Sequence, residues 1–150
     1  MWFMNHLVNP IVRFILRSPL HRLFSGSILL ITYQGRKSKK TYTLPVQYAQ
    51  ADKMVYIVPG APEQKTWWRN LRGGAPVQLR LCGQDLNARA EVLMGEANRA
   101  AIANALGDYL KRFPAAARIH HVRRAPDDSF DIADLQAAAM QTIVVRVMPG

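Results

Sequence analysis

Residues 28–46 read ILLITYQGRKSKKTYTLPV, two apolar runs joined by a short basic segment. Both runs, residues 28–33 and 41–46, are rich in β-branched and aromatic residues, which favour strands. The segment between them contains Gly35, which permits a tight turn. The stretch therefore predicts a β-hairpin whose tip is basic.

The predicted turn concentrates positive charge, because Arg36, Lys37, Lys39 and Lys40 lie within five positions. Such charges repel one another unless solvent or a bound anion separates them. Ser38 adds a hydroxyl, and the amides of a tight turn can complete a phosphate cradle. Two interpretations stay open at this point, an anion-binding turn and an ordinary solvated basic turn.

The charge of the whole chain is also uneven. It has 20 Lys and Arg against 10 Asp and Glu, a net charge of +10, and the first acidic residue is Asp52. This depletion of carboxylates favours an anionic partner such as a phosphate, polyglutamate, a lipid surface or nucleic acid. Nucleic acid is the least favoured, since the basic residues between 111 and 124 come with no recognition motif.

The chain has 150 residues, 49% of them hydrophobic, which predicts one globular domain with a real core. Cys82 is the single cysteine, so no internal disulfide can form, and we expect a cytoplasmic protein. Cys82 ends an apolar run and is expected to be a packed thiol. One cysteine and four dispersed histidines indicate no metal site.

The remaining pattern is mostly that of short strands. We expect strands near residues 46–50, 54–58, 77–82, 86–93 and 142–148. A turn at residues 83–85 would join the strands 77–82 and 86–93. Residues 66–71 predict a helical turn closed by Gly73-Gly74, residues 96–113 predict a helix ended by Pro114, and residues 127–134 predict a polar loop. Antiparallel strands with a helix before the last one indicate a mainly β, partly open barrel.

Residues 1–24 combine apolar positions near helical spacing with Arg13, Arg17 and Arg22. Polar residues interrupt the apolar run too often for a membrane span. Two roles stay open for this amphipathic basic segment. It can cap the barrel, which we favour, or it can contact the inner face of a membrane.

Three segments together carry a resemblance to a known family: residues 30–38, residues 42–46 and Trp67-Trp68-Arg69-Asn70-Leu71. In order and spacing, over roughly residues 10–95, the chain resembles the deazaflavin-dependent nitroreductases among the split β-barrel flavin/deazaflavin oxidoreductases. The resemblance implies a split barrel of six to seven strands that binds coenzyme F420, with FMN used by more distant relatives. It also implies hydride transfer to quinones, nitroaromatics or activated enones.

The resemblance assigns the cofactor-binding residues in four groups. Arg36, Lys37 and Ser38 would hold the phosphate, and Leu44, Pro45 and Val46 would line the ring. Val58, Pro59, Gly60 and Ala61 would present backbone groups to the polar edge of the ring, while Lys65, Trp67, Trp68 and Asn70 would close the far wall. Of the two adjacent indoles, we expect one in the site and one in its wall.

The chain departs from the family pattern at two places. Lys39 follows Ser38 where family members usually have glycine, which puts the path of the cofactor tail in question. The segment 59–62 reads Pro-Gly-Ala-Pro where serine and glycine are common, and the two prolines donate no amide proton to the ring.

The residues themselves indicate that a bound cofactor supplies the chemistry, because no catalytic triad, carboxylate pair or Gly-rich nucleotide loop is present in the sequence. Candidate proton donors are Tyr33, Tyr42, Tyr48, Tyr109 and Lys65, and we favour Tyr48 or Tyr109. The alternative is a non-catalytic or FMN-using split-barrel carrier of flavin, haem or fatty acid. We expect a monomer or homodimer with a small-molecule electron acceptor.

Overall fold

Seven strands and five helical segments make up the computed structural model, which describes residues 27–150. The strands are β1 (Ile28–Gln34), β2 (Thr41–Gln47), β3 (Ala49–Ala51), β4 (Met54–Ile57), β5 (Ala75–Leu81), β6 (Gln84–Leu93) and β7 (Val144–Pro149). The helices are α3 (Arg99–Arg112), α4 (Ala116–Ile119) and α5 (Ile132–Ala139), and the 3₁₀ helices are η2 (Trp67–Leu71) and η3 (Glu96–Asn98). The expectations for residues 1–24 lie outside the described residues.

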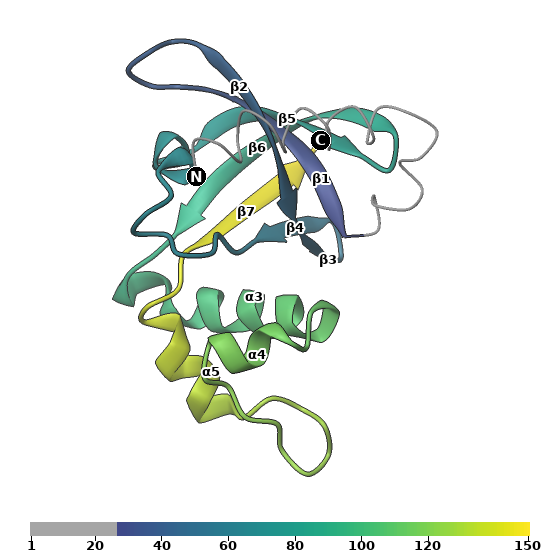
Figure 1. The fold of residues 1–150 in the computed structure, drawn as a ribbon, viewed down its shortest axis with the longest axis vertical. Helices are drawn as coiled ribbons and strands as arrows, with labels where there is room; N and C mark the ends of the chain where they lie inside the picture. Colours follow the sequence, from purple (N-terminus) through teal and green to yellow (C-terminus); the bar gives the residue numbers. More distant parts are fainter. Residues whose placement is uncertain (1–26) are drawn as a thin grey trace.

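The sheet curls because its two edge strands are neighbours in the sequence. The strand order is β2-β1-β5-β6-β7-β4-β3, and every pairing is antiparallel. Only Tyr48 separates β2 from β3, and its amide donates to the Ser27 carbonyl at 3.0 Å. One residue cannot span a flat seven-stranded sheet, so the edges must approach each other and the sheet forms a split barrel (Figure 1). The predicted fold class is thus confirmed.

The barrel interior holds the largest apolar cluster. The alternate β1 residues Leu29, Ile31 and Tyr33 point into it, as period-two strand geometry requires. Trp68 and Leu71 of η2 join the same cluster. Strand β1 and helix η2 therefore pack together in the barrel interior.

A helical layer covers the outer side of β3, β4 and β7 (Figure 1). Leu106 and Leu110 of α3 pack with Ala49 of β3, and Ile102 packs with Val144 of β7. The helix predicted before the last strand is present as η3 and α3. Two further helices, α4 and α5, were not predicted.

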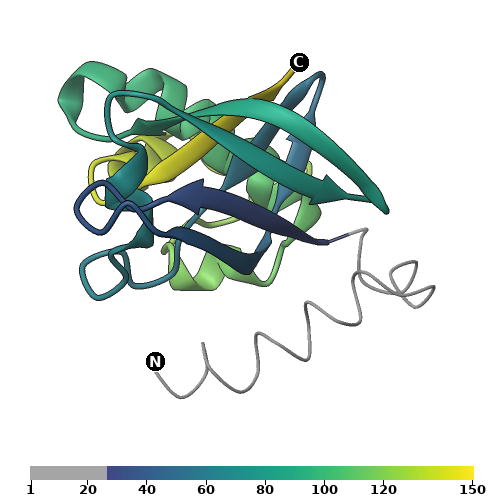
Figure 2. The same ribbon diagram turned by 90° about the horizontal axis from the view of Figure 1, so that it is seen from above.

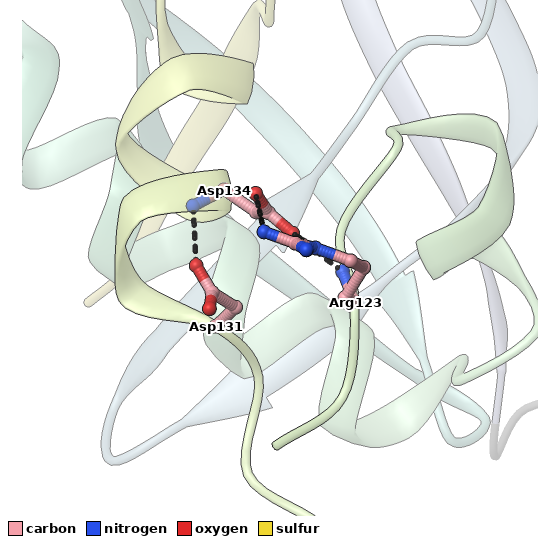
Figure 3. Close-up of polar contacts among 3 residues, drawn as sticks. All are labelled: Arg123, Asp131 and Asp134. Carbon is pink, nitrogen blue, oxygen red and sulfur yellow. Dashed lines mark hydrogen bonds and ion pairs between the residues drawn. The ribbon is translucent and has the colours of Figure 1, made fainter.

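Helix α5 begins inside the segment 127–134, for which the sequence predicted a polar loop. Asp131 caps the helix by accepting a hydrogen bond from the Asp134 amide at 2.9 Å (Figure 3). Arg123 ties the preceding loop to this cap, since its Nε donates to Asp134 Oδ2 at 2.9 Å. The Asp-x-x-Asp spacing before an alanine-rich run is a helix-start signal, and the polar-loop prediction is wrong from Ile132 onward.

The β5–β6 turn lies one residue earlier than predicted. Cys82 and Gly83, with φ of 50° and 80°, form a two-residue turn between Leu81 and Gln84. Cys82 is exposed there, so the expectation of a packed thiol is wrong. Within residues 27–150, no helix is long and apolar enough to cross a membrane.

Candidate functional site

The basic turn between β1 and β2 is closed by its own hydrogen bonds. The Gly35 amide donates to the Lys40 carbonyl at 2.8 Å, and the Lys39 amide donates to the Gly35 carbonyl at 3.0 Å. A Cβ at Gly35 would lie 2.6 Å from Ser38 Oγ and 2.9 Å from the Tyr42 ring, so any other residue would displace these two side chains. Ser38 Oγ also accepts from the Lys40 amide at 3.2 Å and lies 3.1 Å from the Tyr42 hydroxyl.

Two amides at the tip of this turn have no acceptor among the described residues. The Gly35, Lys39 and Lys40 amides are engaged within the turn, and the Arg36 amide donates to Asn70 Oδ1 at 3.0 Å. Only the Lys37 and Ser38 amides remain of the six in residues 35–40. Adjacent free amides on an exposed turn fit an anionic oxygen.

Lys39 adopts the backbone conformation that glycine adopts most easily. Its φ is 59°, in the left-handed region. This conformation gives a physical reason for glycine at this position in the family pattern. The turn keeps a glycine-type path while Lys39 adds a fourth cation.

No acidic residue among those the structure describes pairs with the cations of the turn. Arg36, Lys37, Lys39 and Lys40 are all exposed, and none is part of an ion pair there. Further cations lie on or near η2: the Arg69 and Arg72 guanidinium groups lie 5.5 and 5.2 Å from the Trp68 ring centroid. Arg36 of the turn also reaches the glycines after η2, where a Cβ built on Gly73 would lie 3.8 Å from its Nη2. One further arginine lies there, because a Cβ built on Gly74 would lie 2.6 Å from Arg89 Nη2.

Helix η2 lies beside the turn, on the same side of the barrel (Figure 2). Trp67 is half-buried, and its ring centroid lies 6.1 Å from that of Tyr33, which stacks on Tyr42 at 5.6 Å. Trp68 is buried, and its Nε1 donates to the Pro62 carbonyl at 3.0 Å. Trp68 is thus a core indole, and Trp67 is the more accessible of the two.

The loop after β4 divides the residues predicted there between exposed and buried positions. Gly60 and Ala61 are exposed. Lys65 Nζ lies near Gly60, 4.0 Å from where a Cβ on that residue would be. The Ala61 carbonyl accepts from the Lys65 amide at 3.1 Å, which closes the loop. Pro59 is buried, and Val58 packs against the helical layer instead of the barrel interior.

Strand β2 divides the three predicted ring-lining residues between its two faces. Leu44 and Val46 are half-buried against the interior cluster that also contains Trp67. Pro45 pairs with Leu30 and so lies on the opposite face. A groove of about 320 Å³ lies on that outer face, between Leu30, Thr43 and Arg80, and shares no residue with the predicted site.

The two favoured proton donors lie toward the other end of the hairpin but in different clusters, Tyr48 in the barrel interior and Tyr109 in the helical layer. Tyr109 Oη donates to Gln47 Oε1 at 3.4 Å, and Tyr48 follows Gln47 directly. Tyr48 lies six positions after Tyr42 along the chain, about 20 Å of extended strand. Burial raises the pKa of Tyr48 to about 12, with a smaller contribution from Cys82, and burial also raises the pKa of Tyr109.

Sequence reasoning gave no priority to Tyr33, although the structure places it against Trp67. Burial, and then the nearby Tyr42, raise the pKa of Tyr33 to about 12. Its inward position follows from the alternation of β1, which could have indicated it. Among the described residues, no group of three or more His, Cys, Asp or Glu side chains is placed to hold a metal ion.

Comparison with solved structures identifies the same fold in other proteins. An F420-H2 dependent reductase, FDR-A, superposes with a TM-score of 0.53 at 18% identity over 81% of this chain and 93% of its own. A second structure, described as a domain-swapped dimer, gives a TM-score of 0.52 at 16% identity over 91% and 98%. A comparison with curated protein sequences finds no significant match.

The family itself is identified by sequence. A model of the F420H(2)-dependent quinone reductase family matches residues 17–112, which include the basic turn, η2 and all of α3. This match agrees with the resemblance drawn from the basic turn and the Trp-Trp-Arg-Asn-Leu segment. The chain therefore belongs to the F420H(2)-dependent quinone reductase family, whose members are oxidoreductases that use coenzyme F420.

Proposed function

We propose that this protein holds the phosphate of F420 at the basic turn and reduces a quinone with it. Reduced F420 supplies a hydride when bound; the protein supplies charge, shape and protons. The observation that carries the proposal is a pair of amides, those of Lys37 and Ser38, that have no acceptor within residues 27–150 and lie among four cations with no acidic partner there.

In this proposal each residue of the turn has a distinct role. Arg36 and Lys37 offer charged donors, and Arg36 can bind a phosphate through two N–H groups. Ser38 contributes its amide, since its hydroxyl already accepts from the Lys40 amide. Lys39 and Lys40 add positive potential for the glutamates of the tail.

The apolar wall for the ring would be Trp67 with Leu44 and Val46. These three side chains are half-buried against one interior cluster, so a planar ring can cover apolar surface that is otherwise partly wet. Gly60 and Lys65 lie close together in the loop after β4, where a backbone group or the Lys65 ammonium would hydrogen-bond to the polar edge of the ring.

Tyr48 and Tyr109 would protonate the acceptor. Both hydroxyls are protonated at neutral pH and can therefore donate a proton, while burial, by raising the pKa of each, makes them weaker acids than an exposed tyrosine. The family favours a quinone as acceptor, and we extend the proposal to nitroaromatics and activated enones, which need the same hydride and proton. Contact of residues 1–24 with a membrane would bring the site close to lipid-soluble quinones.

The deciding experiment measures binding of F420 and of FMN, followed by turnover of reduced F420 with a quinone, a nitroaromatic and an enone. We expect F420 binding and the fastest turnover with the quinone. FMN binding without F420 binding would indicate an FMN reductase or a carrier. F420 binding without turnover of any acceptor would indicate a carrier, and binding of neither cofactor would refute the proposal.

A further inference from the structure

We infer that Asn70 is a positioning residue that fixes the basic turn relative to the indole wall. The sequence placed Asn70 in the wall itself, as a residue that touches the cofactor. The inference rests on the proposed function for its link to F420, although the contact can be tested without any cofactor.

Both polar ends of the Asn70 side chain are engaged inside the protein. Its Oδ1 accepts from the Arg36 amide at 3.0 Å, across 34 positions of sequence. Its Nδ2 donates to the Trp67 carbonyl at 2.9 Å. One amide group therefore connects the first cation of the turn to the first residue of η2.

The two bonds also determine which way the amide faces. The opposite orientation would place Nδ2 against the Arg36 N–H and Oδ1 against the Trp67 carbonyl, two repulsive contacts. Asparagine supplies one acceptor and one donor at this spacing, and aspartate supplies only acceptors. The side-chain type is thus matched to joining an amide to a carbonyl.

This contact has a consequence for the phosphate cradle. With the Arg36 amide taken by Asn70, the free amides are those of Lys37 and Ser38, at the tip of the turn. The Arg36 side chain lies near Gly73, just after η2, so it extends along the same side of the barrel as the Asn70 contact. Loss of Asn70 would release the turn from η2 and leave the interval between phosphate and ring undefined.

The first test measures hydrogen exchange of the Arg36 amide in the full chain without cofactor. Asn70→Ala should accelerate exchange of that amide by about tenfold or more, the effect of losing one hydrogen bond. Asn98→Ala is the matched control, because Asn98 Nδ2 also donates to a backbone carbonyl, that of Met94, at 3.0 Å. Unchanged exchange in Asn70→Ala would overturn the inference.

The second test compares F420 with the same deazaflavin cut back to its ribityl chain, without phosphate or glutamates. Asn70→Ala should weaken F420 binding by about tenfold and leave the truncated deazaflavin within about twofold. Equal losses for both ligands would show that Asn70 acts as a wall residue and would overturn the inference. The Asn98→Ala protein should bind both ligands as the wild type does.

Asn70→Asp covers the case in which the alanine variant does not fold. The aspartate keeps an oxygen for the Arg36 amide, so we expect Arg36 exchange close to that of the wild type. Fast Arg36 exchange in a folded Asn70→Asp protein would contradict the contact. A wild-type protein that binds neither deazaflavin would refute the proposed function, while the exchange result would still decide whether Asn70 holds the turn.

Discussion

Two regions of the molecule are rich in cations: the basic turn with η2, and the helical layer. Of the cations that the structure describes in these two regions, only those of the helical layer form ion pairs with carboxylates. Four of the six ion pairs among the described residues lie between residues 96 and 134, from Arg99–Glu96 to Arg123–Asp134. The turn has none. Charge that serves the fold is thus compensated within the chain, and charge left uncompensated is available to a ligand.

Removing two cations from each region is the strongest way to break this comparison. Arg36→Ala with Lys37→Ala should weaken F420 binding by about 10³-fold, because two charge-assisted hydrogen bonds are lost. Arg123→Ala with Arg124→Ala removes the same net charge from the helical layer and should leave binding within a few-fold. Isothermal titration of both double variants measures the difference, and equal losses would show that only net charge matters.

The far end of the β1–β2 hairpin extends the comparison from charge to proton donation. Tyr48→Phe or Tyr109→Phe should lower kcat for quinone reduction by about 10²-fold and leave F420 binding unchanged, since both lie far from the turn. Steady-state kinetics and titration together separate the two effects. If neither variant lowers kcat, Tyr33→Phe becomes the next test, because Tyr33 lies against Trp67.

In the helical layer, a broken ion pair should cost stability instead of binding. Arg123 lowers the pKa of Asp134 below its ordinary value of 3.8, chiefly through their side-chain hydrogen bond. A carboxyl whose pKa is lower when folded stabilises above its unfolded pKa, and this stability is lost as pH falls through the folded value. Arg123→Ala should therefore lower Tm by a few degrees at pH 7 and by less at pH 3, as thermal unfolding will show.

The smallest effect is expected at Lys39. Lys39→Gly removes the conformational cost of a lysine in the left-handed region, which is about 1 kcal/mol. It also raises the conformational entropy of the unfolded chain, which lowers the free energy of unfolding by a similar amount. Thermal stability should therefore stay within about 1 kcal/mol, and F420 binding should weaken only a few-fold. Lys37→Gly, at a residue without positive φ, should be the more destabilising change. The reverse order would contradict the conformation of the turn.

The parts of the fold that the sequence predicted are those with strong local signals. The hairpin of β1 and β2, the helical turn at Trp67–Leu71 and helix α3 follow from alternation, glycines and helical spacing. Helix α5 differs from the prediction because aspartates are typical of loops as well as of helix caps, and Asp131 is the cap of this helix. Cys82 differs because the apolar run before it favours a strand and does not reveal its φ of 50°.

The candidate site divides in the same way. The cations of the turn are visible in the sequence, because charge needs no tertiary structure to be counted. The contact of Asn70 with the Arg36 amide spans 34 positions and depends on how the barrel closes, so no local pattern could show it. That Pro45 lies on the opposite face of β2 from Leu44 and Val46 could be predicted, because it follows from strand alternation once the register is known.

The most direct test of the central claim is the salt dependence of F420 affinity beside that of the truncated deazaflavin. Uncompensated cations at an exposed turn should make F420 binding weaken by about tenfold or more as ionic strength rises from about 0.01 M to 1 M. The truncated deazaflavin should change by no more than about twofold. Equal salt dependence for the two ligands would show that the basic turn does not hold the anionic tail.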